Sequence, residues 1–101
     1  MKYTVHVTAA AFAHAEEAYV WLVARTPQHA LEWFNNLFAT IDSLEENPLR
    51  CPIASKNEDP AGQARCLLYG NKHHAYRIIF DVIGDAVHVL DIRHAARDAG
   101  P

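Results

Sequence analysis

Three strand-like runs in the last third of the sequence constrain the fold most. They cover residues 65–69, 75–82 and 86–93, and each is rich in β-branched, aliphatic or aromatic residues. Gly84-Asp85 separates the last two runs and fits a two-residue hairpin turn, with glycine at the position that needs a positive φ. The segment therefore predicts a meander of three antiparallel strands.

The beginning of the chain predicts one further strand and a helix. Apolar and polar residues alternate over residues 3–7, which is typical of a half-buried strand. Thr8 is a suitable N-cap for a helix over residues 9–25. We expect one face of this helix to be apolar: Phe12, Ala15, Tyr19, Leu22 and Val23.

A second helix is predicted directly after the first. Thr26 is the expected cap, and Pro27 fits the first helical position because its missing N–H costs nothing there. Asn47-Pro48 ends the helix, and the short link at Thr26 implies an antiparallel helical hairpin. Its apolar stripe consists of Ala30, Phe34, Leu37, Phe38, Ile41 and Leu44.

These elements predict an α+β fold in a single domain, residues 1–101. Half of the residues are apolar, which argues against disorder, and 101 residues suffice for one two-layered core. We expect the helices to pack on one face of the sheet. The sheet residues expected beneath them are Ile78, Phe80, Leu90 and Ile92.

Charge is distributed unevenly along the chain. Residues 1–62 carry a net charge of −4, whereas residues 63–101 carry +1 and four of the seven histidines. The total of −3 argues against broad, non-specific binding to nucleic acid, which normally needs a strongly basic face. A local basic site in the second part remains compatible with this balance.

The sequence predicts a cytoplasmic protein without a cofactor. It contains no apolar run of about 20 residues and no apparent signal peptide. Cys51 and Cys66 are therefore expected to be reduced. They match no zinc-binding spacing, even together with the neighbouring histidines His73 and His74, so we predict no metal site.

Arginine and histidine in the C-terminal part are the candidate functional residues. Metal-independent RNA cleavage needs a base, an acid and cations that stabilise the phosphorane, and these residue types can supply all three. The structural alternative is that the histidines are exposed and that Arg77 forms an ion pair with Asp81 or Asp91. The main candidates are Arg65, Arg77, His94 and Arg97, and the secondary ones are His73, His74 and Tyr76.

Trp21 is the candidate for contact with a partner protein. It falls on the side of its helix opposite the apolar stripe, so we expect it to be exposed, and large aromatic residues are enriched in protein interfaces. Trp33, near the margin of its own stripe, is expected to pack at the rim of the core instead.

The order strand, helical hairpin and three-stranded meander resembles the RelE/ParE superfamily of toxins from type II toxin–antitoxin systems. Nearly the whole chain takes part in the resemblance. The matching segments are Arg65 at the start of its strand, Tyr76–Val82 followed by Gly84-Asp85, the terminal His94–Asp98, and the loop from Pro48 to Pro52.

This resemblance implies a toxin that a cognate antitoxin neutralises by forming a hetero-oligomer with it. RelE-like members cleave mRNA on the ribosome, and ParE-like members inhibit DNA gyrase. The terminal His94–Asp98 is more similar to the ParE side. The loop offers only Lys56 where RelE-like toxins have closely spaced lysines, and no tyrosine follows Arg97. The expected function is therefore gyrase inhibition through protein–protein contact, with ribosome-dependent RNA cleavage and a non-toxic binding module as alternatives.

Overall fold

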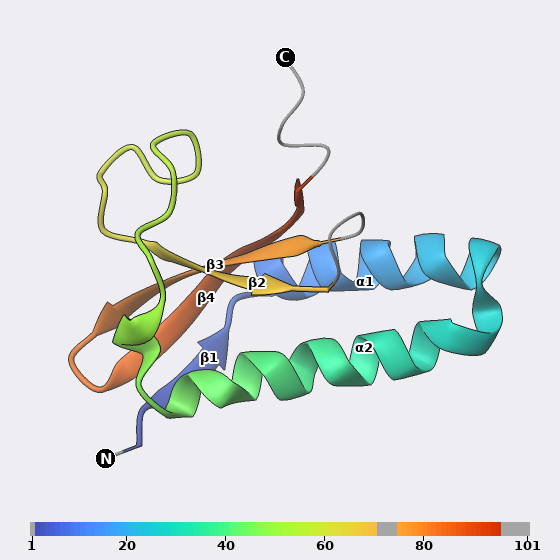
Figure 1. Cartoon of the computed structure of the whole chain (residues 1–101), viewed down its shortest axis with the longest axis horizontal. Coiled ribbons are helices and arrows are strands. Elements are labelled where there is room, and N and C mark those ends of the chain that lie inside the picture. Colours follow the sequence, from blue (N-terminus) through green and yellow to red (C-terminus); the bar gives the residue numbers. More distant parts are fainter. Residues whose placement is uncertain (1, 71–74, 96–101) are drawn as a thin grey trace.

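A computed structural model describes residues 2–70 and 75–95, and it has the predicted α+β architecture. Four strands form one mixed sheet in the order β1-β4-β3-β2, in which β1 runs parallel to β4 and the other pairs are antiparallel. The two helices form a hairpin beside the sheet (Figure 1). The elements are β1 Thr4–Val7, α1 Ala9–Arg25, α2 Pro27–Asp42, β2 Arg65–Tyr69, β3 Tyr76–Ile83 and β4 Ala86–His94.

Helix α1 begins where the sequence predicted. The Thr8 hydroxyl accepts a hydrogen bond from the Ala11 N–H at 3.2 Å, while the Thr8 N–H donates to the Val89 carbonyl at 3.1 Å. This residue therefore caps the helix and also joins it to β4. The face that α1 buries against the sheet was predicted only in part. Ala15 is buried as expected, but its buried neighbours are Ala11 and Ala18, and Phe12 is 42% exposed.

Helix α2 contributes larger side chains to the core. Pro27 occupies its first turn, as expected, and Ala30, Leu37 and Ile41 are fully buried. Thr26 was expected to cap this helix, but its hydroxyl makes no capping bond. Thr26 nevertheless occupies the N-cap position of α2, where its carbonyl accepts from the His29 N–H at 3.0 Å. Its N–H donates to the Leu22 carbonyl at 2.6 Å and so also closes α1.

The β3–β4 hairpin confirms the predicted two-residue turn. Ile83 pairs with Ala86, and Gly84 between them has a φ of +61°, a conformation that L-amino acids with a Cβ rarely adopt. On the helical side of β3, Tyr76, Ile78 and Phe80 are buried, which agrees with the predicted alternation.

The predicted inward row of β4 was partly wrong because the strand contains a β-bulge. Ile79 pairs with Asp91 but Phe80 pairs with Val89, so Leu90 has no partner on β3. The extra residue reverses the alternation within the strand. Val89 is consequently buried before the bulge and Ile92 after it, whereas Leu90, which we expected in the core, is 38% exposed.

The loop between α2 and β2 is ordered by an acidic side chain. The Asp59 carboxylate accepts hydrogen bonds from the N–H groups of Gln63 at 2.7 Å and Ala64 at 2.6 Å, and these bonds lower its pKa. A second, smaller apolar cluster forms where this loop lies against the sheet. It consists of Ala54 and Ala64 of the loop with Cys66 of β2 and Ile79 of β3. In the part of the chain that the structure describes, no helix is long and apolar enough to cross a bilayer.

Candidate functional site

A cleft lined by aromatic rings lies where the strands β3 and β4 meet the helical hairpin. Tyr76 and His94 are opposite each other on adjacent strands, and their rings meet edge to face with centroids 4.9 Å apart. Trp33 of α2 packs against the Tyr76 ring at 5.1 Å. The adjoining cleft has a volume of ≈410 Å³, and the residues that line it include Trp21, Leu22, His29, Trp33, Tyr76 and His94.

Trp21 is exposed, as the sequence predicted, and forms one wall of this cleft. The indole is 40% exposed, and the Arg25 guanidinium lies 3.9 Å from the ring centroid. Arg25 also donates to the Trp21 carbonyl at 3.4 Å. Trp33 is partly buried and packs against the main core, as expected for a residue at the rim. The Trp21 indole, with the Arg25 guanidinium stacked on it, is thus an exposed aromatic surface of the kind that contributes to protein interfaces.

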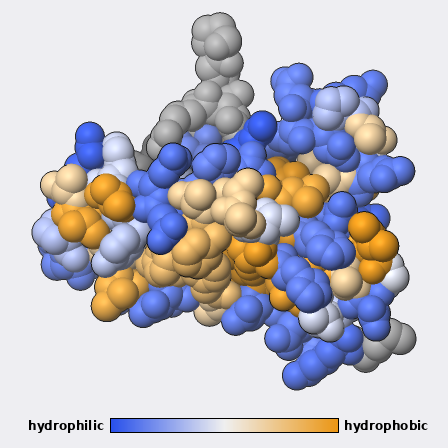
Figure 2. Space-filling model, turned by 180° about the vertical axis from the view of Figure 1, so that it is seen from behind, coloured by the Kyte–Doolittle hydropathy of each residue, from blue (hydrophilic) through white to orange (hydrophobic). Residues whose placement is uncertain are grey.

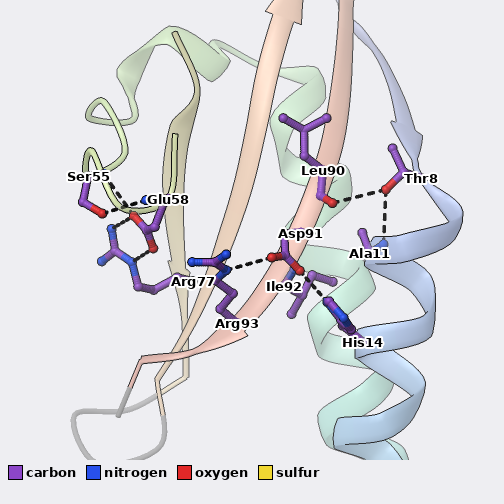
Figure 3. A network of polar contacts seen from close by, with 10 residues as sticks. All are labelled: Thr8, Ala11, His14, Ser55, Glu58, Arg77, Leu90, Asp91, Ile92 and Arg93. Carbon is purple, nitrogen blue, oxygen red and sulfur yellow. Dashed lines mark hydrogen bonds and ion pairs between the residues drawn. The ribbon is translucent and has the colours of Figure 1, made fainter. Parts of the chain in front are cut away.

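A second, more polar groove of ≈320 Å³ shares Tyr76 and His94 with the first. Figure 3 shows its central feature, in which one carboxylate joins α1 to β4. Asp91 accepts hydrogen bonds from His14, from the Arg93 Nε at 2.8 Å and from the Ile92 N–H at 2.8 Å.

The electrostatic state of Asp91 follows from these contacts. Burial raises its pKa, but the hydrogen bonds from Arg93, His14 and the backbone together outweigh burial, so the pKa falls below its usual value. Asp91 is therefore ionised at neutral pH and orients the His14 imidazole and the Arg93 guanidinium at the groove. Sequence reasoning did not select His14 or Arg93. For His14 the reason is distance in the chain, since its partner Asp91 is 77 positions away.

The structure separates Arg65 from His94 along the sheet. Arg65 pairs with Phe80, which pairs with Val89, so it lies level with a point five residues before His94 on β4. One of these five residues is the extra residue of the bulge, and the partners on β3, Phe80 and Tyr76, are four residues apart. At about 3.3 Å per residue, the separation along the sheet is therefore about 13 Å. The Arg65 guanidinium donates to the Cys51 carbonyl at 2.7 Å and to the Leu49 carbonyl at 3.3 Å, and thereby anchors the start of the long loop.

Arg77 is paired with an acidic residue that the sequence did not indicate. Its guanidinium binds both carboxylate oxygens of Glu58 in the long loop, with an Nη2–Oε1 distance of 2.7 Å (Figure 3). The hydrogen bond from Arg77 is the main reason why the pKa of Glu58 falls to about 2. The structural alternative, in which Arg77 pairs with Asp81 or Asp91, is therefore wrong. Asp81 lies 3.3 Å from His88, and Asp91 binds His14 and Arg93.

The remaining predicted residues divide into two groups. His73, His74 and Arg97 lie outside the described residues. Cys51 and Cys66 are free and buried, and burial raises the pKa of both thiols, that of Cys66 to about 11. They are accordingly thiols rather than thiolates at neutral pH. Within residues 2–70 and 75–95, no group of three or more metal-ligating side chains is suitably placed to hold a metal ion.

Comparison with known proteins identifies the class to which this fold belongs. The model of the family described as "ParE toxin of type II toxin-antitoxin system, parDE" matches residues 5–99. The chain therefore belongs to the ParE toxin family of the RelE/ParE superfamily.

Individual relatives agree with this assignment. The Toxin RelE1 of Caulobacter vibrioides is 33% identical over 94 residues, which cover 93% of this chain and 95% of the relative. A structure of the chromosomal ParDE system from P. aeruginosa matches with a TM-score of 0.73 at 19% identity, over 92% of this chain and 96% of that one. The RelBE2 toxin–antitoxin complex from Mycobacterium tuberculosis matches with a TM-score of 0.56 at 18% identity, over 93% and 99% respectively. These two structures support the fold.

Proposed function

We propose that this chain is a ParE-like toxin that inhibits DNA gyrase in the cytoplasm through protein–protein contact and is neutralised by a cognate antitoxin. The family match supports the toxin class. The observation that favours contact over catalysis is the separation of the candidate RNA-cleaving groups. Arg65 is bound to loop carbonyls and Arg77 to Glu58, and Arg65 and His94 lie about 13 Å apart along the sheet.

Ribosome-dependent mRNA cleavage is the second candidate, and the polar groove is the feature that favours it. His14, held by Asp91, and His94 line one groove together with Arg93. A histidine pair beside an arginine has the residue types for acid–base chemistry at a phosphodiester. In this alternative, His14 is a catalytic candidate in addition to His94.

One comparison separates these functions. The chain is induced alone in cells, and growth, gyrase supercoiling by purified enzyme and cleavage of ribosome-bound mRNA are measured. We expect growth arrest and loss of supercoiling with intact mRNA. Cleaved mRNA with normal supercoiling would establish the ribonuclease alternative, and normal growth with neither effect would indicate a non-toxic binding module.

Single substitutions then locate the surface that acts on the target. We propose that the terminal basic residues His94 and Arg97 contact it, with Arg65 and Arg77 as further candidates. Arg97→Ala should relieve growth inhibition without changing the melting temperature. If RNA is the target, His94→Ala or His14→Ala should lower the cleavage rate about 10²-fold or more. Toxicity that survives both Arg97→Ala and Arg65→Ala would direct attention to the loop around Lys56.

The antitoxin is proposed to cover the cleft that contains Trp21. A neutralising segment that folds on binding would bury the exposed indole. Trp21→Ala should weaken antitoxin binding by more than about 1 kcal/mol, with an unchanged circular dichroism spectrum. Ile83→Ala is the matched control, because Ile83 is also exposed, at 64%, but lies at the β3–β4 turn. An unchanged dissociation constant for Trp21→Ala would exclude this residue from the interface.

A further inference from the structure

The cleft beside Trp21 has the size and the lining of a site for a small molecule. Its volume of ≈410 Å³ lies within the range of about 300–1,000 Å³ that is usual for such sites. The residues that line it come from α1, α2, β3 and β4, so four elements support the cleft. We define the Trp21 cleft by its aromatic and imidazole rings: Trp21, His29, Trp33, Tyr76 and His94.

The rings of the Trp21 cleft form one packed wall and one open wall. Tyr76 is 5% exposed and is held between Trp33, at 5.1 Å, and His94, at 4.9 Å. The Trp21 indole is 40% exposed, and among the described residues it packs against no other aromatic ring. A flat aromatic ligand would supply the ring contacts that this indole lacks.

The fixed charge at the Trp21 cleft is positive. Arg25 lines the cleft, and no carboxylate does so among the described residues. Within residues 2–70 and 75–95, Arg25 takes part in no ion pair. Its hydrogen bond to the Trp21 carbonyl, at 3.4 Å, leaves other N–H groups of the guanidinium for a ligand. Because the chain as a whole carries −3, any attraction of an anion to this cleft must be local.

We propose that the Trp21 cleft binds a small aromatic carboxylate. The ring of the ligand lies between Trp21 and the wall that contains Tyr76, and its carboxylate pairs with the Arg25 guanidinium, whose planar fork matches two carboxylate oxygens. An aromatic cation would be repelled by Arg25, and an aliphatic acid would lose the ring contacts. The inference does not rest on the proposed function, because binding is measured with the chain alone. An antitoxin segment that covers Trp21 would compete with such a ligand.

Three matched compounds test the proposal. The probe is phenylacetate; phenylacetamide lacks its charge, and cyclohexylacetate lacks its aromatic ring. Trp21 and Trp33 are the only tryptophans of the chain, so both indole N–H signals of a proton–nitrogen NMR spectrum report on the cleft. We expect phenylacetate to shift both signals in a saturable titration, with a dissociation constant below about 1 mM. The amide and the cyclohexyl compound should each bind at least fivefold more weakly.

Substitution of the cation separates recognition of the carboxylate from general damage to the cleft. Arg25→Gln should weaken phenylacetate at least fivefold and change the binding of phenylacetamide by less than twofold, whereas damage to the cleft would weaken both. Lys56→Gln removes the same charge from an exposed position in the long loop and should leave both ligands unaffected. The remaining backbone signals of each variant show whether its fold is intact.

Adhesion to other apolar surfaces needs its own control. Figure 2 shows a band of apolar residues across the face of the molecule that is seen from behind. Val20 is 67% exposed and does not line the Trp21 cleft, so Val20→Ala should leave phenylacetate binding unchanged.

Several results would overturn the proposal. Phenylacetate that binds no better than the amide or the cyclohexyl compound would remove the proposed basis of recognition. Equal affinity of wild type and Arg25→Gln would exclude the carboxylate contact, and a loss of binding in Val20→Ala would place the ligand outside the cleft. The absence of a saturable shift at ten times the expected dissociation constant would exclude the site itself.

Discussion

Replacing Glu58 by glutamine tests how the long loop is held on the sheet. The Glu58 side chain is only 4% exposed, and both of its oxygens bind Arg77. Its pKa falls from 4.5 to about 2, chiefly because of the hydrogen bond from Arg77. At about 1.4 kcal/mol per pKa unit, the charged form stabilises the fold by at most roughly 3.5 kcal/mol. Because the Arg77 side chain is 28% exposed and solvent screens part of the interaction, we expect a loss of about 2 kcal/mol.

The pH dependence provides the sharper measurement. A depressed pKa in the folded state means that the stabilisation is complete above the unfolded-state value of about 4.5 and disappears as the pH falls toward 2. Urea unfolding should therefore show wild type and Glu58→Gln about 2 kcal/mol apart at pH 7 and nearly equal near pH 2. Glu46→Gln, at an exposed position, should differ from wild type by less than about 0.5 kcal/mol throughout. A difference for Glu58→Gln that is equally large at pH 6 and pH 2.5 would refute the reasoning.

Three further substitutions or reactions test the fold. Val89→Ala should cost about 2 kcal/mol in urea unfolding and Leu90→Ala less than about 1 kcal/mol, because Val89 is buried and Leu90 lies at the bulge; the reverse order would contradict the register. Thr8→Ala should lower stability by about 1 kcal/mol, and an unchanged melting temperature would exclude a capping role. A thiol reagent at pH 8 should modify Cys66 far more slowly in the folded chain than in urea, since this thiol is buried and its pKa is about 11; equal rates would contradict its burial.

Local signals in the sequence predicted the elements well. Thr8, Pro27 and Gly84 act through their own backbone or the next turn, so their roles can be recognised without knowledge of the rest of the chain. The bulge at Leu90 has no such signal, because it depends on which residue of β3 stands opposite. Periodicity likewise showed that α1 has apolar residues, but not that the row of alanines rather than the row with Phe12 would face the sheet.

The candidate site was harder to predict than the fold. The type of a residue shows which reactions or bonds its side chain can take part in, but not which other side chain it will contact. Arg77 was selected correctly as a charged residue of β3, yet its partner Glu58 comes from a loop 19 positions earlier. His14 was passed over because it stands alone in a helix. Its significance appears only when the bulged strand brings Asp91 to the side of α1.

The strand register limits any mechanism that uses the C-terminal basic residues together. Arg65 is level with Phe80, toward the β3–β4 turn, whereas His94 stands beside Tyr76 at the opposite end of β3. A single phosphodiester spans only a few ångströms and cannot contact groups at both ends of a separation of about 13 Å. If RNA is cleaved, the described residues available beside His94 therefore include His14, Tyr76 and Arg93, and Arg65 acts through the loop that it anchors. A protein target has no such restriction, because an interface of ordinary size extends over both ends of the sheet.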